Sequence, residues 1–422
     1  MKAILGAGIF SLPWAVAQAR RGPPGRRRSA PRPRFRPRLV RTSPAGTATG
    51  TRHAKRNAFF HASRQGGLVF VPLFIFAACL LSLHTLSFLV VAKRALLAEN
   101  PKLGDKLSSY TGIVEAALGP LGGRAAEVMN LSCCFGICSA YLVFVGATLA
   151  TVLGAPQNAM VWAITPPMVG LAWMRSMSGA AMIALVGNAS VAAGIAFVCF
   201  VALQQPLQLA ALPLANPAGF GSYFGSVAFL FFIHFTLPAI ESSMAVPSAF
   251  MGATAKAFGV CAALGAAFGV VGAAAFGPAV SSVVITMLGE TPAATAVKLL
   301  LSVNLMLTFP IVCRSAFLIV EGLAEKGGQA LGTWQQRALR SAFVLAASLV
   351  ATTIPSFGAL LALVGGVSLS VISMVFPSAI VLFGRKADGS VLVPLPAAQR
   401  AAAALIMVAG LAIVVYTLVS AA

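Results

Sequence analysis

The sequence predicts an all-α polytopic membrane protein with about eleven transmembrane helices. The 422 residues are 59% apolar and only 9% charged, whereas about a quarter of the residues of a soluble domain are charged. Their mean hydropathy is +0.90. Apolar segments of about 20 residues, the length of a bilayer crossing, recur from one end of the chain to the other. We therefore expect a single transmembrane domain over residues 1–422, embedded in the lipid bilayer of the plasma membrane, the vacuole or another endomembrane.

We expect eleven segments to cross the membrane. They are residues 1–19, 67–92, 125–153, 156–174, 179–203, 220–241, 257–280, 295–321, 337–360, 361–384 and 399–421. Pro355 marks the turn between the ninth and tenth segments, because proline cannot continue a helical hydrogen-bond ladder. Gly265 and Gly269 of the seventh segment have the GxxxG spacing that favours close helix packing in membranes. Basic residues concentrate in alternate loops, which predicts a cytoplasmic amino terminus and an outer carboxyl terminus.

Residues 20–64 break this pattern. They hold 14 of the 30 Lys and Arg residues and none of the 9 Asp and Glu residues. They are rich in Pro, Arg and Ser/Thr and lack apolar periodicity, so we expect a disordered basic insertion within the transmembrane domain. Its place on the outer side contradicts the positive-inside trend. A lipid- or polyanion-binding arm, an insertion without a role and a translated non-coding sequence are the alternatives.

The net charge of +21 does not predict a nucleic-acid partner. Outside residues 20–64 there are 16 basic residues against 9 acidic ones, a net charge of +7, which the basic loops of a membrane protein explain. The seven cysteines lie in apolar segments without metal-ligand spacing. The sequence also has no phosphate loop, HExxH motif or nucleophile elbow. We therefore expect neither an enzyme, nor a cofactor, nor a metal site.

Two segments, the first and the sixth, are interrupted in matching positions. Residues 6–13 (GAGIFSLP) combine two glycines with a proline, and residues 231–238 (FFIHFTLP) also end in a proline. A proline removes the donor for the carbonyl four residues earlier, which is that of Ile9 in the first segment and His234 in the sixth. Lipid cannot satisfy such groups, so an interruption persists where it faces a cavity or a bound solute. Paired interruptions of this kind indicate the binding site of a secondary transporter.

Two polar side chains lie in these interruptions. Ser11 lies in the first, where a substrate ligand and simple packing by the glycines are equal alternatives. His234 lies in the sixth, and an ionisable group deep in a membrane helix indicates a functional site. His234 could donate to a substrate carboxylate, titrate in a proton-coupled cycle, or bond a carbonyl of its own interrupted helix.

Five stretches share a pattern with one known family. Residues 2–15 (KAILGAGIFSLPWA) contain the first interruption and residues 229–247 contain the sixth. The other three, in order, are residues 109–122, 307–310 (LTFP) and 354–365. Together they resemble the amino acid/auxin permease family of transmembrane amino acid transporters. The resemblance implies the broken-helix transporter fold, with five-plus-five inverted repeats and one further helix.

The resemblance implies that an amino acid binds between the two interruptions. Its amino and carboxyl groups would lie between the backbones of the first and sixth spans. The hydroxyl of Tyr141, in the third span, would close the site, and an aromatic residue at the membrane interface is the alternative for Tyr141. The implied substrate-binding residues are Gly6, Gly8, Ser11, Tyr141, His234 and Phe235.

The resemblance also implies an ion site that includes the eighth span. Thr308 matches the position where sodium-coupled relatives have a hydroxyl ligand. Pro310 leaves the carbonyl of Met306 free, and a hard cation would bind that oxygen together with Thr308 and the carbonyl of Ile9. A Thr308 hydroxyl bonded to its own helix is the alternative.

We therefore expect a secondary active transporter of small amino acids, driven by a proton or sodium gradient, whose broken helices expose the site alternately to each side. Its partners would be the amino acid, the proton or sodium ion and the lipid bilayer. Arg314 and Glu241 could form a gate pair, or Arg314 could snorkel to the interface. The alternatives are a membrane sensor that binds an amino acid without moving it, and an inactive product. Only five residues precede Gly6, whereas family members have a longer first helix. Family members also join the first and second spans tightly, without an insertion such as residues 20–64. Both departures favour the inactive product.

Overall fold

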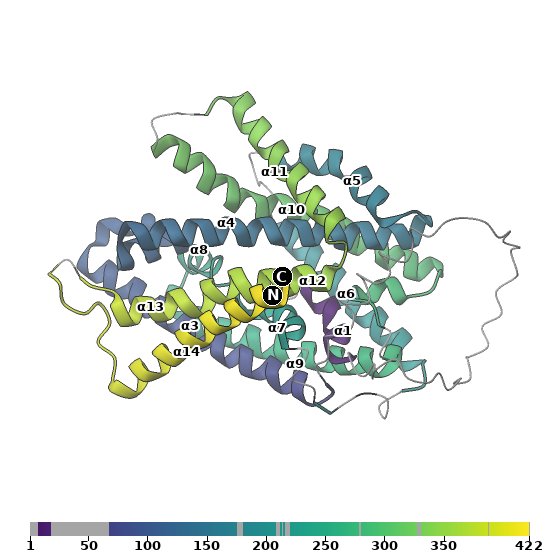
Figure 1. The fold of residues 1–422 in the computed structure, drawn as a ribbon, viewed down its shortest axis with the longest axis horizontal. Coiled ribbons are helices and arrows are strands. Elements are labelled where there is room, and N and C mark those ends of the chain that lie inside the picture. Colours follow the sequence, from purple (N-terminus) through teal and green to yellow (C-terminus); the bar gives the residue numbers. More distant parts are fainter. Residues whose placement is uncertain are drawn as a thin grey trace, which may run out of the picture.

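The computed structural model shows a bundle of helices, some of which run along its longest axis while others cross it obliquely (Figure 1). It describes residues 7–17, 67–174, 180–207, 212, 214–215, 220–277, 280–326, 331–386 and 388–421. Within these ranges every extended regular element is a helix, and seven helices are long and apolar enough to cross a membrane. The all-α membrane fold expected from the composition is therefore present. The expected insertion at residues 20–64 lies outside the described residues.

The helices follow the order of the expected spans. They are η1 (Ala7–Ser11), α1 (Leu12–Ala17), α3 (Phe70–Glu99), η2 (Pro101–Leu103), η3 (Lys106–Ser108), α4 (Tyr110–Leu153), α5 (Gln157–Ala172), α6 (Ala180–Leu203), α7 (Phe220–Phe231), α8 (Leu237–Ser243), η6 (Pro247–Ala249), α9 (Phe250–Phe276), η8 (Val284–Met287), α10 (Pro292–Lys326), α11 (Thr333–Thr353), α12 (Phe357–Val364), η9 (Gly365–Leu369), η10 (Val371–Val375), α13 (Phe376–Phe383) and α14 (Ala397–Ala421). η9 and η10 are π-helical segments, and the other η elements are short 3-10 helices.

Four of the eleven expected spans are not among these seven long apolar helices of the described residues. The first is the 3-10 helix η1, which runs directly into the short α1. The sixth is divided into α7 and α8. The fourth, α5, has only 16 residues, and the ninth, α11, has 21 residues with polar first turns. The turn expected at Pro355 lies between α11 and α12, where the Ser356 hydroxyl accepts the N–H of Ala359.

The helix that contains the third span begins earlier than the expected residue 125. α4 starts at Tyr110 and has 44 residues. The Ser109 hydroxyl caps it by accepting the N–H of Gly112 at 3.1 Å. Gly119 interrupts its geometry with φ 77° and ψ −175°, a conformation open to glycine because glycine has no Cβ. Charged residues before position 125 concealed this extension in the sequence.

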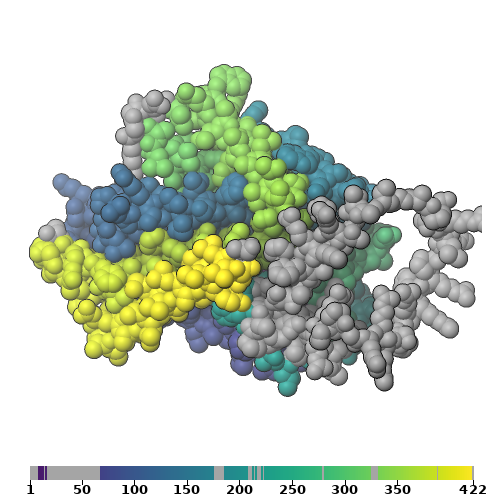
Figure 2. Space-filling view, viewed as in Figure 1, coloured from purple at the N-terminus to yellow at the C-terminus, as the bar shows by residue number. Residues whose placement is uncertain are grey.

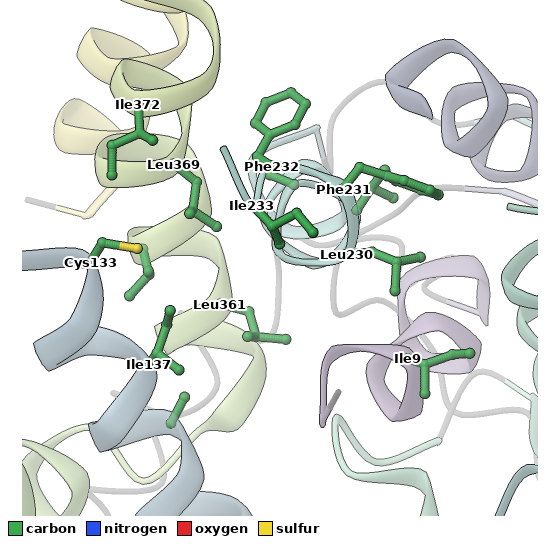
Figure 3. Close-up of a cluster of buried hydrophobic side chains, with 14 of the residues drawn as sticks. Ile9, Cys133, Ile137, Leu230, Phe231, Phe232, Ile233, Leu361, Leu369 and Ile372 are labelled. Carbon is green, nitrogen blue, oxygen red and sulfur yellow. The ribbon is translucent and has the colours of Figure 1, made fainter. Parts of the chain in front are cut away.

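The tenth span contains irregular helix that the sequence did not predict. The π-helical segments η9 and η10 join α12 to α13. At this place the backbone of α7 lies directly against the tenth span. A methyl group added to Gly365 would lie 2.6 Å from the Cα of Gly225, and one added to Gly225 would overlap the backbone of Ala362. Figure 3 shows Leu361 and Leu369 in the buried cluster between α4 and the last turn of α7.

α1 packs directly against the small residues of α9. A methyl group added to Gly265 would lie 3.0 Å from Leu12, and one added to Gly269 would lie 3.2 Å from Val16. At Gly272 it would lie 2.6 Å from the ring of Pro13. The close packing predicted from the GxxxG spacing is therefore confirmed, and its partner is the first span.

The last helix, α14, lies on the outside of the bundle (Figure 2). Its large apolar side chains are exposed, with Leu405 at 72%, Val408 at 60% and Val419 at 72% of their full exposure. An exposed apolar surface of this extent fits contact with lipid, because lipid is as apolar as the side chains themselves.

We expect Gly225→Ala to destabilise the protein by about 1–3 kcal/mol, because the added methyl group forces the backbones of α7 and α12 apart. Gly259→Ala in α9 is the matched control, since a methyl group there meets nothing within 4 Å and alanine favours helix. Thermal unfolding of the purified protein should give a lower midpoint for Gly225→Ala alone. Equal midpoints for the two variants would contradict the close backbone contact.

Candidate functional site

The interruption expected in the sixth span is present. α7 ends at Phe231, α8 begins at Leu237, and the residues between them are not helical. The N–H of Ile233 donates to the carbonyl of Phe231 at 2.9 Å, and the N–H of Thr236 donates to that of Ile233 at 3.0 Å. One detail of the expectation was wrong. The carbonyl of His234 is not left free by Pro238, because it accepts the N–H of Leu237 at 3.4 Å in the turn that starts α8.

Two hydroxyl groups of α3 bond the interruption. Ser82 donates to the carbonyl of Phe231 at 2.8 Å, and the Oγ1 of Thr85 lies 3.0 Å from the Nε2 of His234. The side chains of Ser82, Thr85 and His234 are fully buried. Sequence analysis missed both hydroxyls, although their spacing of three residues in an apolar helix places them on one face. The unwound backbone therefore has polar partners inside the bundle.

The hydrogen bonds of Thr85 define which nitrogen of His234 carries the proton. A hydroxyl has one proton to donate, and Thr85 lies 3.1 Å from the carbonyl of Leu81 and 3.2 Å from that of Ser82. The largest number of hydrogen bonds forms when the Thr85 hydroxyl donates to one of these carbonyls and accepts the Nε2–H of His234. We therefore assign the proton of the neutral ring to Nε2. The Nδ1 is then a lone-pair acceptor, buried and without a partner among the described residues.

The interruption also leaves two backbone donors. The N–H groups of His234 and Phe235 donate to no backbone carbonyl of the described residues. Phe235 itself is half-buried and packs against the apolar core. Adjacent N–H donors beside a buried imidazole acceptor can bind a small solute with a carboxylate at one end and an ammonium group at the other.

The first span packs beside this interruption. Gly8 lies against α7, and a methyl group added to it would lie 3.1 Å from the ring of Phe229. Figure 3 shows Ile9 next to Leu230 in the same buried cluster. The structure therefore brings the first span to the end of α7 that leads into the interruption, while Gly6 lies outside the described residues. The hydroxyl of Ser11 donates to the carbonyl of Gly8 at 2.7 Å, so it bonds its own helix.

The ring of Phe10 fixes the position of η1. Its centroid lies 6.0 Å from that of Phe144 in α4 and 5.9 Å from that of Phe268 in α9. A methyl group added to Gly194 of α6 would lie 3.0 Å from it. Tyr141, three residues before Phe144, is buried at 7% exposure. Within the described residues no hydrogen bond joins Tyr141 to His234.

The eighth span offers oxygen atoms within about one turn of α10. The Thr308 hydroxyl donates to the carbonyl of Asn304 at 2.7 Å, so its proton is used within its own helix. The Oδ1 of Asn304 is buried and has no partner among the described residues. Pro310 lies inside the helix and cannot donate to the carbonyl of Met306. The structure does not link these atoms to Ile9 by any hydrogen bond between described residues.

The charged partner of Glu241 is Lys93 rather than Arg314. The Nζ of Lys93 in α3 lies 3.0 Å from the Oε2 of Glu241 in α8. The gate pair considered between Glu241 and Arg314 is therefore replaced by a pair between α3 and α8. Lys93 lies just after residue 92, where the second span was expected to end, so from the sequence alone it counts among the basic residues of a loop.

We expect Ser82→Ala to destabilise the protein by about 1–3 kcal/mol, because the carbonyl of Phe231 would be left buried without a donor. Ser87→Ala on the same helix is the control. Ser87 donates to the carbonyl of His84. This carbonyl belongs to the continuous helix α3, so it stays within the helical backbone when the serine side chain is removed. Thermal unfolding should separate the two variants, and a Ser82→Ala midpoint equal to that of Ser87→Ala would contradict this role.

Comparisons with known proteins support the expected family. The family model described as transmembrane amino acid transporter protein matches residues 61–421. The amino acid transporter AVT3C of Arabidopsis thaliana is 26% identical over 344 residues, which are 75% of this chain and 77% of that protein. The amino acid transporter ANT1 of the same organism is 25% identical over 309 residues, 65% of this chain and 71% of that protein.

A solved structure with a similar arrangement is that of the manganese transporter of Eremococcus coleocola. It is 9% identical, has a TM-score of 0.46 and covers 99% of this chain and 94% of that one, a likeness too low to support a functional conclusion. The family model and the named relatives confirm the expectation of a transporter, not an enzyme. Since the family model matches most of the chain, this chain belongs to the transmembrane amino acid transporter family and is a multi-pass integral membrane protein.

Proposed function

We propose that the protein is a secondary active transporter of small amino acids, with its site at the interruption of the sixth span. The observation that carries the proposal is a fully buried His234 beside unwound backbone whose N–H groups lack backbone acceptors among the described residues. Polar backbone at membrane depth is tolerated where it faces protein or a solute. Broken helices of this kind form the binding sites of transporters that work by alternating access.

The chemistry of the site favours an α-amino acid without a large side chain. The N–H groups of His234 and Phe235 are the donors for its carboxylate, and the Nδ1 of His234 is an acceptor for its ammonium group. The backbone at Gly8 forms the opposite wall, where the Ser11 hydroxyl holds the carbonyl of Gly8, and Gly6, which lies outside the described residues, is proposed to extend it. The Tyr141 hydroxyl closes this space from α4.

Either a proton or a sodium ion drives the transport. A proton would bind the Nδ1 of His234, the acceptor that lacks a partner among the described residues, and the protonated ring would then donate to the substrate carboxylate instead of accepting from the ammonium group. A sodium ion would bind oxygen atoms, and the Asn304 side chain, the Thr308 hydroxyl and the carbonyls of Met306 and Ile9 are the ligands for it. Among these the Oδ1 of Asn304 is the buried oxygen without a partner in the described structure.

We expect His234→Ala to lower the initial rate of amino acid uptake by at least about tenfold, because the site loses the buried imidazole that would bond the substrate. The test is uptake of radiolabelled small amino acids into proteoliposomes. His84→Ala is the matched control, since His84 is an exposed residue of α3 whose ring packs on Phe88 at 4.6 Å. Normal uptake by His234→Ala would show that the substrate binds elsewhere in the protein.

The same vesicles separate transport from the alternatives. A transporter accumulates substrate inside when a gradient is imposed, whereas a sensor binds substrate without accumulation and an inactive product does neither. Uptake that follows an imposed pH gradient in sodium-free buffer would assign the coupling to protons. Uptake that requires sodium, with a higher sodium requirement in Thr308→Ala, would assign it to sodium. Flux that no gradient accelerates would reject secondary active transport.

A further inference from the structure

A buried ion pair joins α3 to the second half of the interrupted span. The Nζ of Lys93 lies 3.0 Å from the Oε2 of Glu241, 2.9 Å from the hydroxyl of Ser242 and 3.5 Å from the carbonyl of Pro238. The side chains of Lys93 and Glu241 are 8% and 7% exposed. One ammonium group therefore bonds three acceptors of a helix that is only seven residues long.

Stability alone gives a weak reason for this pair. The desolvation energy lost when two charges are buried is about as large as their attraction. Apolar residues of similar size would stabilise the fold equally well. The loss of one partner is different, because it leaves a buried charge without compensation. A pair with this property suits an element that must be held in one state and released in another. α8 is such an element, since the unwound stretch before it separates it from α7.

The pair continues the polar face of α3 that bonds the interruption. Ser82, Thr85 and Lys93 are spaced three and eight residues apart, so they lie on one side of the helix. Thr85 and Lys93 are about 12 Å apart along the helix axis, at 1.5 Å per residue. Figure 1 places α8 toward the end of the bundle where α13 and α14 are joined. That connection contains Arg385 and Lys386, and the positive-inside rule assigns this end to the cytoplasm.

The pair lines two spaces of different kinds. One is an open cavity of about 320 Å³, which Arg94 and Ser242 also line. The other is a dry void that Leu86, Leu89, Ile113 and Pro238 also line, and it has no room for a water molecule. Leu86 follows Thr85 in α3, and Pro238 is the second residue of α8.

We propose that the Lys93–Glu241 ion pair is the cytoplasmic gate of a route that runs between α3 and α8 to the interruption at His234. The closed pair seals the dry void from the open cavity. Its separation releases α8 from α3, admits water along Leu89 and exposes the site to the cytoplasm. This inference rests on the proposed function, because the route needs a solute at the interruption. Lys93 acts as a positioning residue for α8 and does not contact the substrate.

The experiment measures access to the void in the full-length protein. Leu89→Cys is the reporter in inside-out vesicles, with a membrane-impermeant thiol reagent on the cytoplasmic face. Leu89 is 1% exposed, so the reporter should label slowly while the pair is intact. Lys93→Gln and Glu241→Gln should each raise the labelling rate by about tenfold or more, because each leaves one buried charge unpaired. The charge swap of Lys93→Glu with Glu241→Lys should return the rate toward that of the parent.

The matched control is Lys106→Gln. Lys106 pairs with Glu115 at 3.1 Å on the same side of the membrane, but its side chain is 42% exposed, and exposed pairs contribute little. This variant should label as slowly as the parent. Protein without the reporter corrects for the seven native cysteines.

Two results would overturn the gate. One is equal labelling in Lys93→Gln and Lys106→Gln, and the other is a charge swap that labels as fast as the single variants. The charge swap keeps both charges, so it carries the test if size-exclusion chromatography shows that a single variant misfolds. Labelling needs no substrate. A wild-type protein that moves no amino acid would therefore reject the proposed function while leaving this result readable.

Discussion

The hydrogen bonds from α3 to the interrupted sixth span are the constraint on which the centre of this protein depends. Ser82 bonds the carbonyl of Phe231, and Thr85 bonds the ring of His234. An unpaired polar group in an apolar environment costs roughly 2–7 kcal/mol, so an unwound stretch without partners would be more stable as continuous helix. α3 therefore belongs to the candidate site as much as the sixth span does, although it contributes no interruption of its own.

Glycine determines how closely the elements around the site approach one another. Gly225 and Gly365 let the backbones of α7 and the tenth span touch, and Gly272 accommodates the ring of Pro13. Membrane helices gain little from burying apolar surface away from lipid, so contact of this kind is a main source of their association. The first span is held against α7 and α9 by such contacts, and Gly8 is thereby brought to the last turn of α7, which leads into the interruption.

The polar face of α3 serves two purposes along its length. Near the middle of the helix its hydroxyls satisfy the unwound backbone, and near its end the ammonium group of Lys93 bonds α8. Hydroxyls suit the first purpose because they carry no charge, so that burying them costs less free energy than burying a charged group. A charge suits the second because its partner can be exchanged for water at the edge of the bundle. One helix thus links the candidate site with the end of the bundle that carries the basic loops.

The sequence by itself determined the membrane class, the order of the spans and the place of the sixth interruption. These follow from local physics, because lipid requires long apolar helices, and Pro238 removes a helical hydrogen-bond donor beside the ionisable His234. Only the tertiary structure decided the partners. Serine and threonine in membrane helices usually bond their own backbone, as Ser11 and Thr308 do, and nothing local distinguishes Ser82 or Thr85 from them. Glu241 bonds a lysine 148 residues away in the sequence, and its choice of Lys93 over Arg314 depends on which helix packs beside α8.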